Sequence, residues 1–331
     1  MKAWVLHGAR DLRLEEQKMP EIREGEVLLR VEAAGICGSD IPRIYDTGAH
    51  VHPLIPGHEF AGTVVESTDL SLLGKRVGVF PLIPCQECDM CRQKKYEMCR
   101  KYNYLGSRCD GAFAEYVRVP VWNLIELPDE VTFEQAAMLE PLAVAVHAVR
   151  RAKVTEDDSA VIIGFGTIGM LVAMVLKSKG IKNITAVVNK ASHSKMAIEL
   201  GLNAENYGEN TVAANVVFEC VGRQDTVAKA IEIVAPEGRV VTVGNPHSDM
   251  QFDRNIYWKI LRSQLTVIGT WNSSFTKDKT DDWHQAISLL RENGKMMENI
   301  ITHRLPLERL ETGLHIMRDK TEIYGKILVV R

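Results

Sequence analysis

The sequence predicts an α/β protein of two domains, an all-β lobe followed by a doubly wound parallel sheet. Three observations lead to this fold class. Short strand patterns separated by Gly and Pro fill the chain up to about residue 125. Apolar strands then alternate with helical segments, and this part begins at a glycine-rich turn. A chain of 331 residues with 46% hydrophobic content is also long enough to bury two cores.

The first lobe is expected to consist of strands and to end at a long helical run. Its predicted strands are KAWVL, DLRLEE, EVLLRVEAAG, FAGTVVES, KRVGVF, AFAEYVRVP and WNLIELP. From Thr132 the pattern changes to an apolar-rich helix that continues to Ala152, with Thr132 and Gln135 spaced as in a capping box. This change predicts a domain boundary near residue 145.

Charge and hydropathy narrow the class of partner. The formal net charge is −3, and no basic block or acidic tail indicates nucleic acid or an anionic membrane. The first dozen residues alternate apolar and charged side chains, unlike a signal peptide, and no apolar run approaches a membrane span. We therefore expect a cytoplasmic protein that acts on a small molecule, with no nucleic-acid or membrane partner.

Four of the seven cysteines are clustered in CQECDMCRQKKYEMC. Cys85, Cys88, Cys91 and Cys99 follow the spacing C-x2-C-x2-C-x7-C and supply the four thiolates of a tetrahedral zinc site. In a reducing compartment such clusters bind metal more often than they form disulfides. The alternatives are thiols that merely cluster or pair, and an iron–sulfur site, whose usual spacings differ. A site closed by four thiolates predicts a structural role, so the chemistry must lie elsewhere.

The second domain begins with a candidate dinucleotide-binding turn. Gly164, Gly166 and Gly169 form G-x-G-x-x-G between the strand VII and a helix, and the strand NITAVV and the helix SKMAIELG follow. Such glycines allow a tight turn and close approach of a pyrophosphate to the helix N-terminus. The alternative is an ordinary strand–turn–helix. Further predicted units are ANVVFECVG, a helix over 224–234, RVVTVG, LTVIGTW and a helix over 281–293.

The end of the second strand of this domain indicates which dinucleotide binds. Domains of this type that prefer NAD usually carry an acid there, which binds the ribose 2′-hydroxyl. Here Val188 is followed by Asn189 and Lys190, so no acid repels a 2′-phosphate. We therefore predict a preference for NADP(H). The alternative is that Lys190 is a solvated surface charge.

Three short motifs in the first lobe offer ligands for a second metal ion. GICGSD, PGHEF and MLEP supply the thiolate of Cys37, the imidazole of His58 and the carboxylates of Glu59 and Glu140. Each residue alone has a plainer interpretation as a core thiol, a loop histidine or a surface charge. Their combination with a dinucleotide domain and a tetracysteine loop favours a catalytic zinc.

Taken together, the motifs resemble the zinc-containing medium-chain alcohol and polyol dehydrogenases, particularly the sorbitol and polyol-phosphate branch. The motifs that carry the resemblance are GICGSD, PGHEFAG, the tetracysteine loop, DGAFAEY, LEPLAVAVHA, GFGTIG and GKILVV. The resemblance implies a GroES-like β-barrel catalytic domain over 1–145 and 284–331, with the tetracysteine lobe at 85–99. A Rossmann domain over 146–283 would lie between these two parts. It also implies a homodimer or homotetramer and two zinc ions per chain.

The resemblance further implies roles for individual residues. Cys37 and His58 would bind the catalytic zinc, with Glu59 and Glu140 as exchangeable ligands. Ser39 would carry the alcohol proton away and Asp40 would orient His58, although both are also plausible helix caps. The residues implied to bind the cofactor are Gly164, Gly166, Thr167, Ile168, Gly169, Val188, Asn189, Lys190, Val221, Val243, Gly269 and Trp271.

The substrate pocket is predicted less directly. Tyr45 and Trp271 would form its walls, and Arg43, His50, Arg108 and Lys326 are candidates to hold a substrate phosphate. The alternative for these basic residues is surface charge or structural pairing.

The whole sequence predicts a zinc- and NAD(P)-dependent oxidoreductase that interconverts a polyol, or a polyol phosphate, and a ketose. A general secondary-alcohol or sorbitol-type dehydrogenase is the first alternative, and a dinucleotide-binding protein without turnover is the second. In one place the chain departs from the family pattern, because the stretch 203–213 is too short for a full crossover helix.

Overall fold

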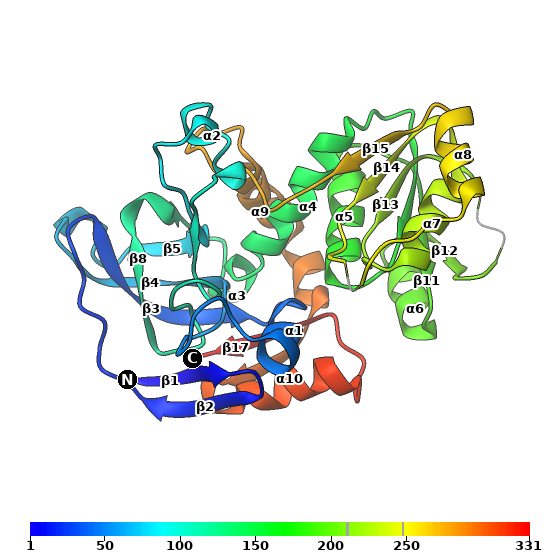
Figure 1. Ribbon diagram of the computed structural model, residues 1–331. Coiled ribbons are helices and arrows are strands. Elements are labelled where there is room, and N and C mark those ends of the chain that lie inside the picture. The colour runs from blue at the N-terminus through cyan, green and yellow to red at the C-terminus, as the bar shows by residue number, and fades with distance from the viewer. Residues whose placement is uncertain (210–211, 247) are drawn as a thin grey trace. The chain divides into compact units, whose positions relative to one another are not determined.

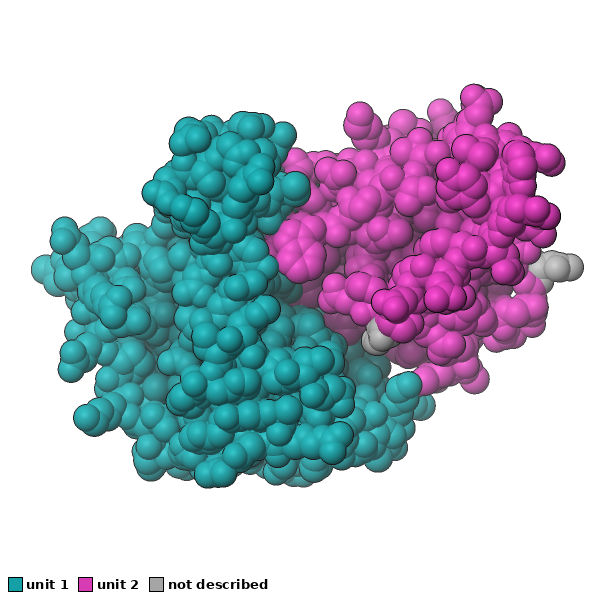
Figure 2. Space-filling view, in the orientation of Figure 1, with its two compact units in different colours: residues 1–140, 274–331 teal, residues 141–273 magenta. Residues whose placement is uncertain are grey.

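The computed structural model describes residues 1–209, 212–246 and 248–331. The chain forms two compact units, Met1–Glu140 with Ser274–Arg331, and Pro141–Ser273 (Figure 2). The junctions thus lie at residues 140 and 273, whereas the sequence predicted 145 and 283. The first junction falls inside one helix, α4 (Leu139–Ala152), where helical periodicity gives no signal for a boundary.

The second boundary was misplaced because residues 274–283 belong to an aromatic core of the first unit. Phe275 and Trp283 are buried and lie against Phe80, with ring centroids 5.1 and 5.5 Å apart. Trp122 completes the cluster at 5.3 Å from Phe275. Burying these large rings together accounts for the return of the chain to the first unit before α9 (Asp282–Ile300) begins.

A seven-stranded sheet forms the centre of the first unit (Figure 1). Strand β3 (Glu26–Gly35) pairs antiparallel with β4, β8 and β17, so residues far apart in the chain meet beside it. The other strands of this sheet are β4 (Glu59–Ser67), β5 (Arg76–Val79), β8 (Tyr116–Pro120), β9 (Leu124–Glu126), β16 (Ile301–Pro306) and β17 (Lys326–Val330). The core beneath it contains Leu29, Phe60, Phe113, Leu314 and Ile327.

Two further strand pairs, five helices and several single turns complete the described part of this unit. Strands β1 (Lys2–Gly8) and β2 (Asp11–Glu16) form a hairpin, and β6 (Leu82–Ile83) pairs with β7 (Asn103–Tyr104). The helices are α1 (Asp40–Pro42), α2 (Asp89–Arg92), α3 (Phe133–Ala136), α9 and α10 (Leu310–Asp319), with a π turn at Arg43–Thr47 and 3-10 turns at Leu70–Leu72, Tyr96–Met98, Val121–Asn123 and Leu307–Arg309.

The helical run expected over residues 132–152 is interrupted. The capping box is present, since the Thr132 hydroxyl accepts from the N–H of Gln135 while the Gln135 side chain accepts from the N–H of Thr132. The helix it begins, α3, nevertheless ends at Ala136, and α4 starts anew at Leu139. The break places Glu140 in the first turn of a new helix.

The second unit is the doubly wound parallel sheet that the sequence predicted. Its strand order is β12-β11-β10-β13-β14-β15, and all its pairs are parallel. The strands are β10 (Ser159–Ile163), β11 (Asn183–Val188), β12 (Asn203–Asn206), β13 (Ala214–Glu219), β14 (Val234–Thr242) and β15 (Thr266–Gly269). Its helices are α5 (Thr167–Ser178), α6 (Ala191–Glu199), α7 (Gln224–Ile233) and α8 (Arg254–Arg262). The predicted α/β fold class is confirmed.

The short connection between β12 and β13 also matches the sequence. Its described residues, 207–209 and 212–213, contain no helix, whereas Asn210 and Thr211 of the predicted segment lie outside the described residues. In 1–209, 212–246 and 248–331, no helix combines the length and apolar character needed to cross a membrane.

Candidate metal and dinucleotide sites

The pairing of β3 with β4 brings the predicted catalytic ligands together. Gly35, the last residue of β3, lies opposite Glu59, the first residue of β4. Cys37 follows β3 by two residues and His58 directly precedes β4, so both approach Glu59 at the same end of the ladder. The ligand atoms of Cys37, His58 and Glu59 lie within 4.8 Å of one another. Thiolate, imidazole and carboxylate are the donors that zinc prefers, so the set fits the predicted ion.

This arrangement requires a glycine at position 35. A Cβ there would lie 2.4 Å from Glu59 Oε2 and 2.7 Å from Lys326 Cε, well inside van der Waals contact. The absence of a side chain at Gly35 therefore makes room for the carboxylate.

The negative charges of Asp40 and Cys37 act on the His58 imidazole. His58 Nδ1 lies 3.5 Å from Asp40 Oδ1, and both side chains are buried. Burial alone would lower the pKa of His58, but the charges of Asp40 and Cys37 raise it well above its ordinary value. Burial would raise the pKa of the Asp40 carboxyl, but His58 and Arg43 hold it below the usual range. Asp40 therefore lies beside the imidazole that the sequence analysis expects it to orient.

Ser39 points at the candidate metal ligand rather than capping a helix. Its hydroxyl donates to Cys37 Sγ over 3.3 Å and makes no capping bond to α1. Asp40 instead accepts the backbone N–H of Cys37 over 3.0 Å. Both residues therefore form hydrogen bonds with Cys37.

Lys326 is a correction to the sequence prediction, which placed it among candidates for a substrate phosphate. Its side chain is buried on β17 and forms an ion pair with Glu59. Burial would lower the pKa of this ammonium group, but Glu59 and Cys37 raise it. The charge of Lys326 is thus taken up inside the ligand cluster, where it offsets the negative charge of the candidate ligands.

Glu140 lies beside the triplet, near enough to interact electrostatically with His58, Glu59 and Lys326. Burial raises the pKa of its carboxyl to about 7. Its Oε1 accepts the hydroxyl of Tyr104 over 3.3 Å. The ring of Tyr104 also meets that of His58 edge to face, with centroids 5.8 Å apart. The sequence analysis missed Tyr104, because a tyrosine in a two-residue strand carries no motif.

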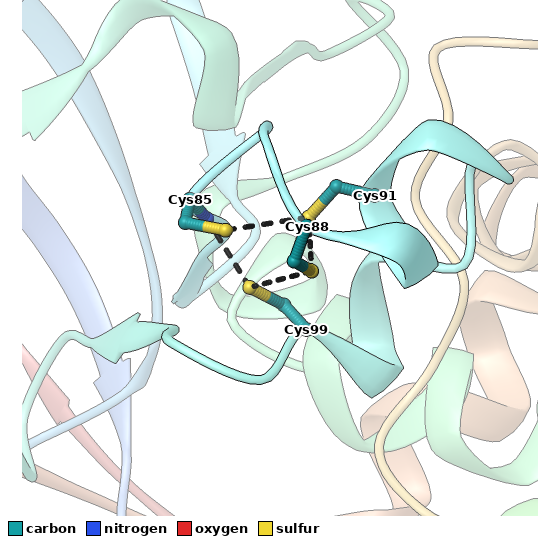
Figure 3. Close-up of side chains that lie close together, drawn as sticks. All are labelled: Cys85, Cys88, Cys91 and Cys99. Carbon is teal, nitrogen blue, oxygen red and sulfur yellow. Dashed lines mark hydrogen bonds between the residues drawn. The ribbon is translucent and has the colours of Figure 1, made fainter.

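The four clustered cysteines form a second candidate metal site (Figure 3). The sulfur atoms of Cys88 and Cys91 are 3.5 Å apart, those of Cys85 and Cys91 3.9 Å, and those of Cys88 and Cys99 4.0 Å. A zinc–sulfur bond of 2.3 Å predicts about 3.8 Å between sulfurs at the corners of a tetrahedron. The set therefore fits zinc without rearrangement.

Backbone groups favour the thiolate at one corner of this site. The N–H groups of Arg100 and Cys91 lower the pKa of Cys88 to about 6. Burial raises the pKa of Cys91 instead. A preformed thiolate at Cys88 supplies a first ligand for an entering cation.

The glycine-rich turn of the second unit has the geometry of a phosphate site. Gly164 has a φ of +89°, and an added Cβ would lie 2.3 Å from Val221 Cγ2. A Cβ on Gly169 would lie 2.1 Å from the carbonyl oxygen of Gly164, so both positions require glycine. Gly166 faces open space and precedes Thr167 and the rest of α5, whose N-terminal N–H groups favour an anion.

The turn after β11 is where the sequence analysis expects the ribose of the cofactor to bind. Val188 is buried at the end of β11, while Asn189 and Lys190 are exposed. Tyr207, which the sequence analysis did not single out, donates its backbone N–H to the carbonyl of Val188 over 2.7 Å. The backbone of Tyr207 is therefore a further neighbour of this end, while its side-chain hydroxyl donates to Asp225 over 3.2 Å.

Other predicted cofactor residues follow β13 and its neighbours. Glu219, buried at the end of β13, accepts the N–H groups of Val221 and Gly222 at 2.8 Å each. Its carbonyl accepts the N–H of Val243 over 2.8 Å. Gly269 ends β15, and Trp271 is 52% exposed beyond it. These residues occupy the carboxyl ends of parallel strands, where ligands of such sheets bind.

Three of the four basic candidates for a substrate phosphate lie near one another. His50 has its pKa lowered by partial burial and by the charges of Arg108 and Arg43. Arg43 also pairs with Asp40, while the guanidinium of Arg108 stacks on Tyr102 at 4.8 Å. The predicted wall residue Tyr45 is half-buried, with the guanidinium of Arg318 over its ring at 4.4 Å.

Comparison with known proteins agrees with this geometry. The model of the alcohol dehydrogenase GroES-like domain matches residues 23–129, and that of the zinc-binding dehydrogenases matches 167–292. Galactitol 1-phosphate 5-dehydrogenase of Escherichia coli K12 is 34% identical over 96% of each chain. The chain belongs to the zinc-containing medium-chain dehydrogenases. It is therefore an oxidoreductase that uses zinc and a nicotinamide cofactor.

Further members of the family extend the likeness. Sorbitol dehydrogenase of Bombyx mori is 32% identical over 99% of this dehydrogenase and 97% of the relative. The crystal structure of galactitol-1-phosphate dehydrogenase from E. coli superposes with a TM-score of 0.91 at 33% identity and covers all of both chains. A zinc-binding dehydrogenase from Sinorhizobium meliloti 1021, bound to NADP, gives a TM-score of 0.88 at 26% identity, with 100% and 99% covered.

Proposed function

We propose that this dehydrogenase oxidises a secondary hydroxyl of a polyol or polyol phosphate and reduces the corresponding ketose, with a substrate similar to galactitol 1-phosphate. The observation that carries the proposal is the triplet Cys37, His58 and Glu59, with Glu140 beside it. Ligands of this kind leave zinc a position for an exchanging oxygen, unlike four thiolates. Relatives at 34% and 32% identity are named for galactitol 1-phosphate and sorbitol.

Zinc bound there would supply a Lewis acid that lowers the pKa of a substrate hydroxyl, and the nicotinamide would accept hydride from carbon. The residues of the chain would accept the proton of the substrate hydroxyl and balance the charge of the metal ligands. Ser39, adjacent to Cys37, is placed to accept the hydroxyl proton and pass it outward. Asp40 keeps His58 oriented, and Lys326 offsets the charge of Glu59.

We assign the substrate phosphate to Arg43, His50 and Arg108. They are close enough for the two guanidinium groups to lower the pKa of His50. A phosphate dianion would be attracted by all three groups and could accept bidentate bonds from a guanidinium.

We assign NADP(H) as the preferred cofactor. The turn after Val188 carries no acid, and Lys190 is exposed at the start of α6. A cation at this point favours a ribose that bears a 2′-phosphate.

We also propose that the chain forms a homodimer or homotetramer through its second unit, in a reducing compartment such as the cytoplasm. Among the described strands, β15 is the edge of its sheet and pairs with β14 on one side only. Large apolar side chains are exposed on β15 and on α8, namely Val267, Tyr257, Trp258 and Leu261. An unpaired edge beside apolar surface favours association between copies. The seven free cysteines agree with a reducing location.

Initial rates of the zinc-loaded protein would test the proposed substrate and cofactor. Ribulose, fructose, tagatose and their phosphates would each be offered with NADH and with NADPH. We expect faster turnover of a phosphorylated ketose, with NADPH preferred. Arg108→Gln should remove the preference for the phosphate, whereas Arg118→Gln, which alters a guanidinium paired with Glu26, should not.

Other outcomes of this experiment support the alternatives. Turnover of unphosphorylated ketoses with NADH would identify a sorbitol-type dehydrogenase and refute both finer assignments. No turnover of any pair, together with only one zinc ion per chain, would favour a dinucleotide-binding protein without catalysis.

A further inference from the structure

Tyr104 contacts two residues of the catalytic site at once. Its hydroxyl donates to Glu140 Oε1 over 3.3 Å, and its ring meets His58 edge to face at 5.8 Å and 63°. An ionised carboxylate only accepts hydrogen bonds, so the tyrosine hydroxyl is the donor of this pair. The contact engages one oxygen of Glu140, a carboxyl that interacts electrostatically with His58, Glu59 and Lys326.

The chain segment that holds Tyr104 is part of the base of the tetracysteine loop. Tyr104 ends β7, which follows Cys99, and it pairs with Leu82 of β6, which precedes Cys85. The two-residue ladder therefore joins the two ends of the loop that contains the four cysteines. The ladder is itself anchored, because the buried amide of Asn123 donates to the carbonyl of Leu82 over 2.8 Å.

We propose that Tyr104 is a positioning residue, whose hydroxyl holds Glu140 as a ligand of the catalytic zinc and which is itself held by the tetracysteine loop. This inference rests on the proposed zinc site at Cys37, His58 and Glu59. A ligating carboxylate needs a hydrogen-bond partner to fix its orientation, and loss of such a partner typically weakens metal binding by about 10- to 100-fold. Among the described side chains, Tyr104 is the one that donates a hydrogen bond to the Glu140 carboxylate.

Tyr104→Phe isolates the hydroxyl, because phenylalanine keeps the ring against His58. We expect the catalytic site to bind zinc about 10- to 100-fold more weakly, while the tetracysteine site keeps its ion. In the cobalt-substituted protein, the visible absorption bands of the catalytic site should shift. The matched control is Tyr96→Phe, a tyrosine within the same loop whose ring lies 4.9 Å from Trp122, and this variant should retain wild-type affinity and spectrum.

A double-mutant cycle tests whether Tyr104 acts through Glu140. If it does, Tyr104→Phe should cost little further affinity in a Glu140→Ala background. Additive losses, or unchanged zinc affinity in Tyr104→Phe, would overturn the inference. If instead the wild-type chain binds zinc only at the tetracysteine loop, the proposed function itself fails. Two zinc ions per chain with an unaffected Tyr104→Phe variant would refute the inference alone.

Discussion

The carboxyl of Glu140 should make binding of the catalytic metal depend on pH near neutrality. Burial raises its pKa to about 7, so below that pH the carboxyl keeps its proton and an entering cation must displace it. In protein that already holds one zinc at the tetracysteine loop, affinity for the second zinc should rise with pH between about pH 6 and pH 8. Isothermal titration would measure this. Glu140→Gln should release one proton fewer on binding, and equal pH slopes for the two proteins would contradict the assignment.

The proposed preference for NADP(H) rests on the exposed cation Lys190 after β11. Lys190→Glu places a negative charge beside the expected 2′-phosphate, so kcat/KM for NADPH should fall by about tenfold or more, about 1.4 kcal/mol, with little loss for NADH. Lys182→Glu, near the opposite end of β11, is the matched control. Equal losses for both cofactors would show that Lys190 does not distinguish them.

The residues of the site differ in how far the sequence revealed them. Cys37, His58 and Glu59 follow from their motifs, because ligand chemistry depends on residue type and the motifs flank strand ends. Lys326 was misassigned, since its neighbour Glu59 is distant in the chain and only the β3–β17 pairing brings them together. Tyr104 was missed because a tyrosine in a two-residue strand carries no motif, and its partner Glu140 belongs to another element.

Among the elements, the tetracysteine loop should stabilise the catalytic unit as well as hold its own ion. Cys91→Ser removes a buried cysteine ligand, so the chain should bind one zinc fewer and its Tm should fall by several degrees. If the loop holds Tyr104 in place, the remaining site should also lose zinc more readily to a chelator. Cys109→Ser, a thiol outside the loop, should change neither quantity. Unchanged Tm and zinc content in Cys91→Ser would refute the structural role.

Element types were easier to predict than element ends. Strands with alternating or continuous apolar patterns, such as β3 and β10, lie where the sequence places them. The helix expected over 281–293 instead continues to Ile300, across non-helical backbone at Asn293. The helical run from Thr132 is likewise broken after Ala136. Both differences arise from tertiary packing, which local periodicity does not report.

For the whole molecule, association through α8 and β15 can be tested by a single charge. Tyr257 is 61% exposed on α8, so Tyr257→Glu should place an unpaired carboxylate in the proposed contact and shift the protein to a smaller species. Sedimentation velocity would measure the change. Leu70→Glu alters a residue of the first unit that is 75% exposed and should leave the assembly intact. A wild-type chain that sediments as a monomer would contradict the proposal.

The interrupted course of the catalytic unit affects when its parts become available during synthesis. All four thiolates of the tetracysteine loop leave the ribosome within one short stretch, so this loop can close around zinc early. The ion-pair partner of Glu59, Lys326, is instead synthesised only after the entire second unit. Until β17 adds to β3, the buried carboxylate lacks its counter-charge. If both proposed sites hold zinc, the structural ion should therefore be acquired while the chain is growing and the catalytic ion after release.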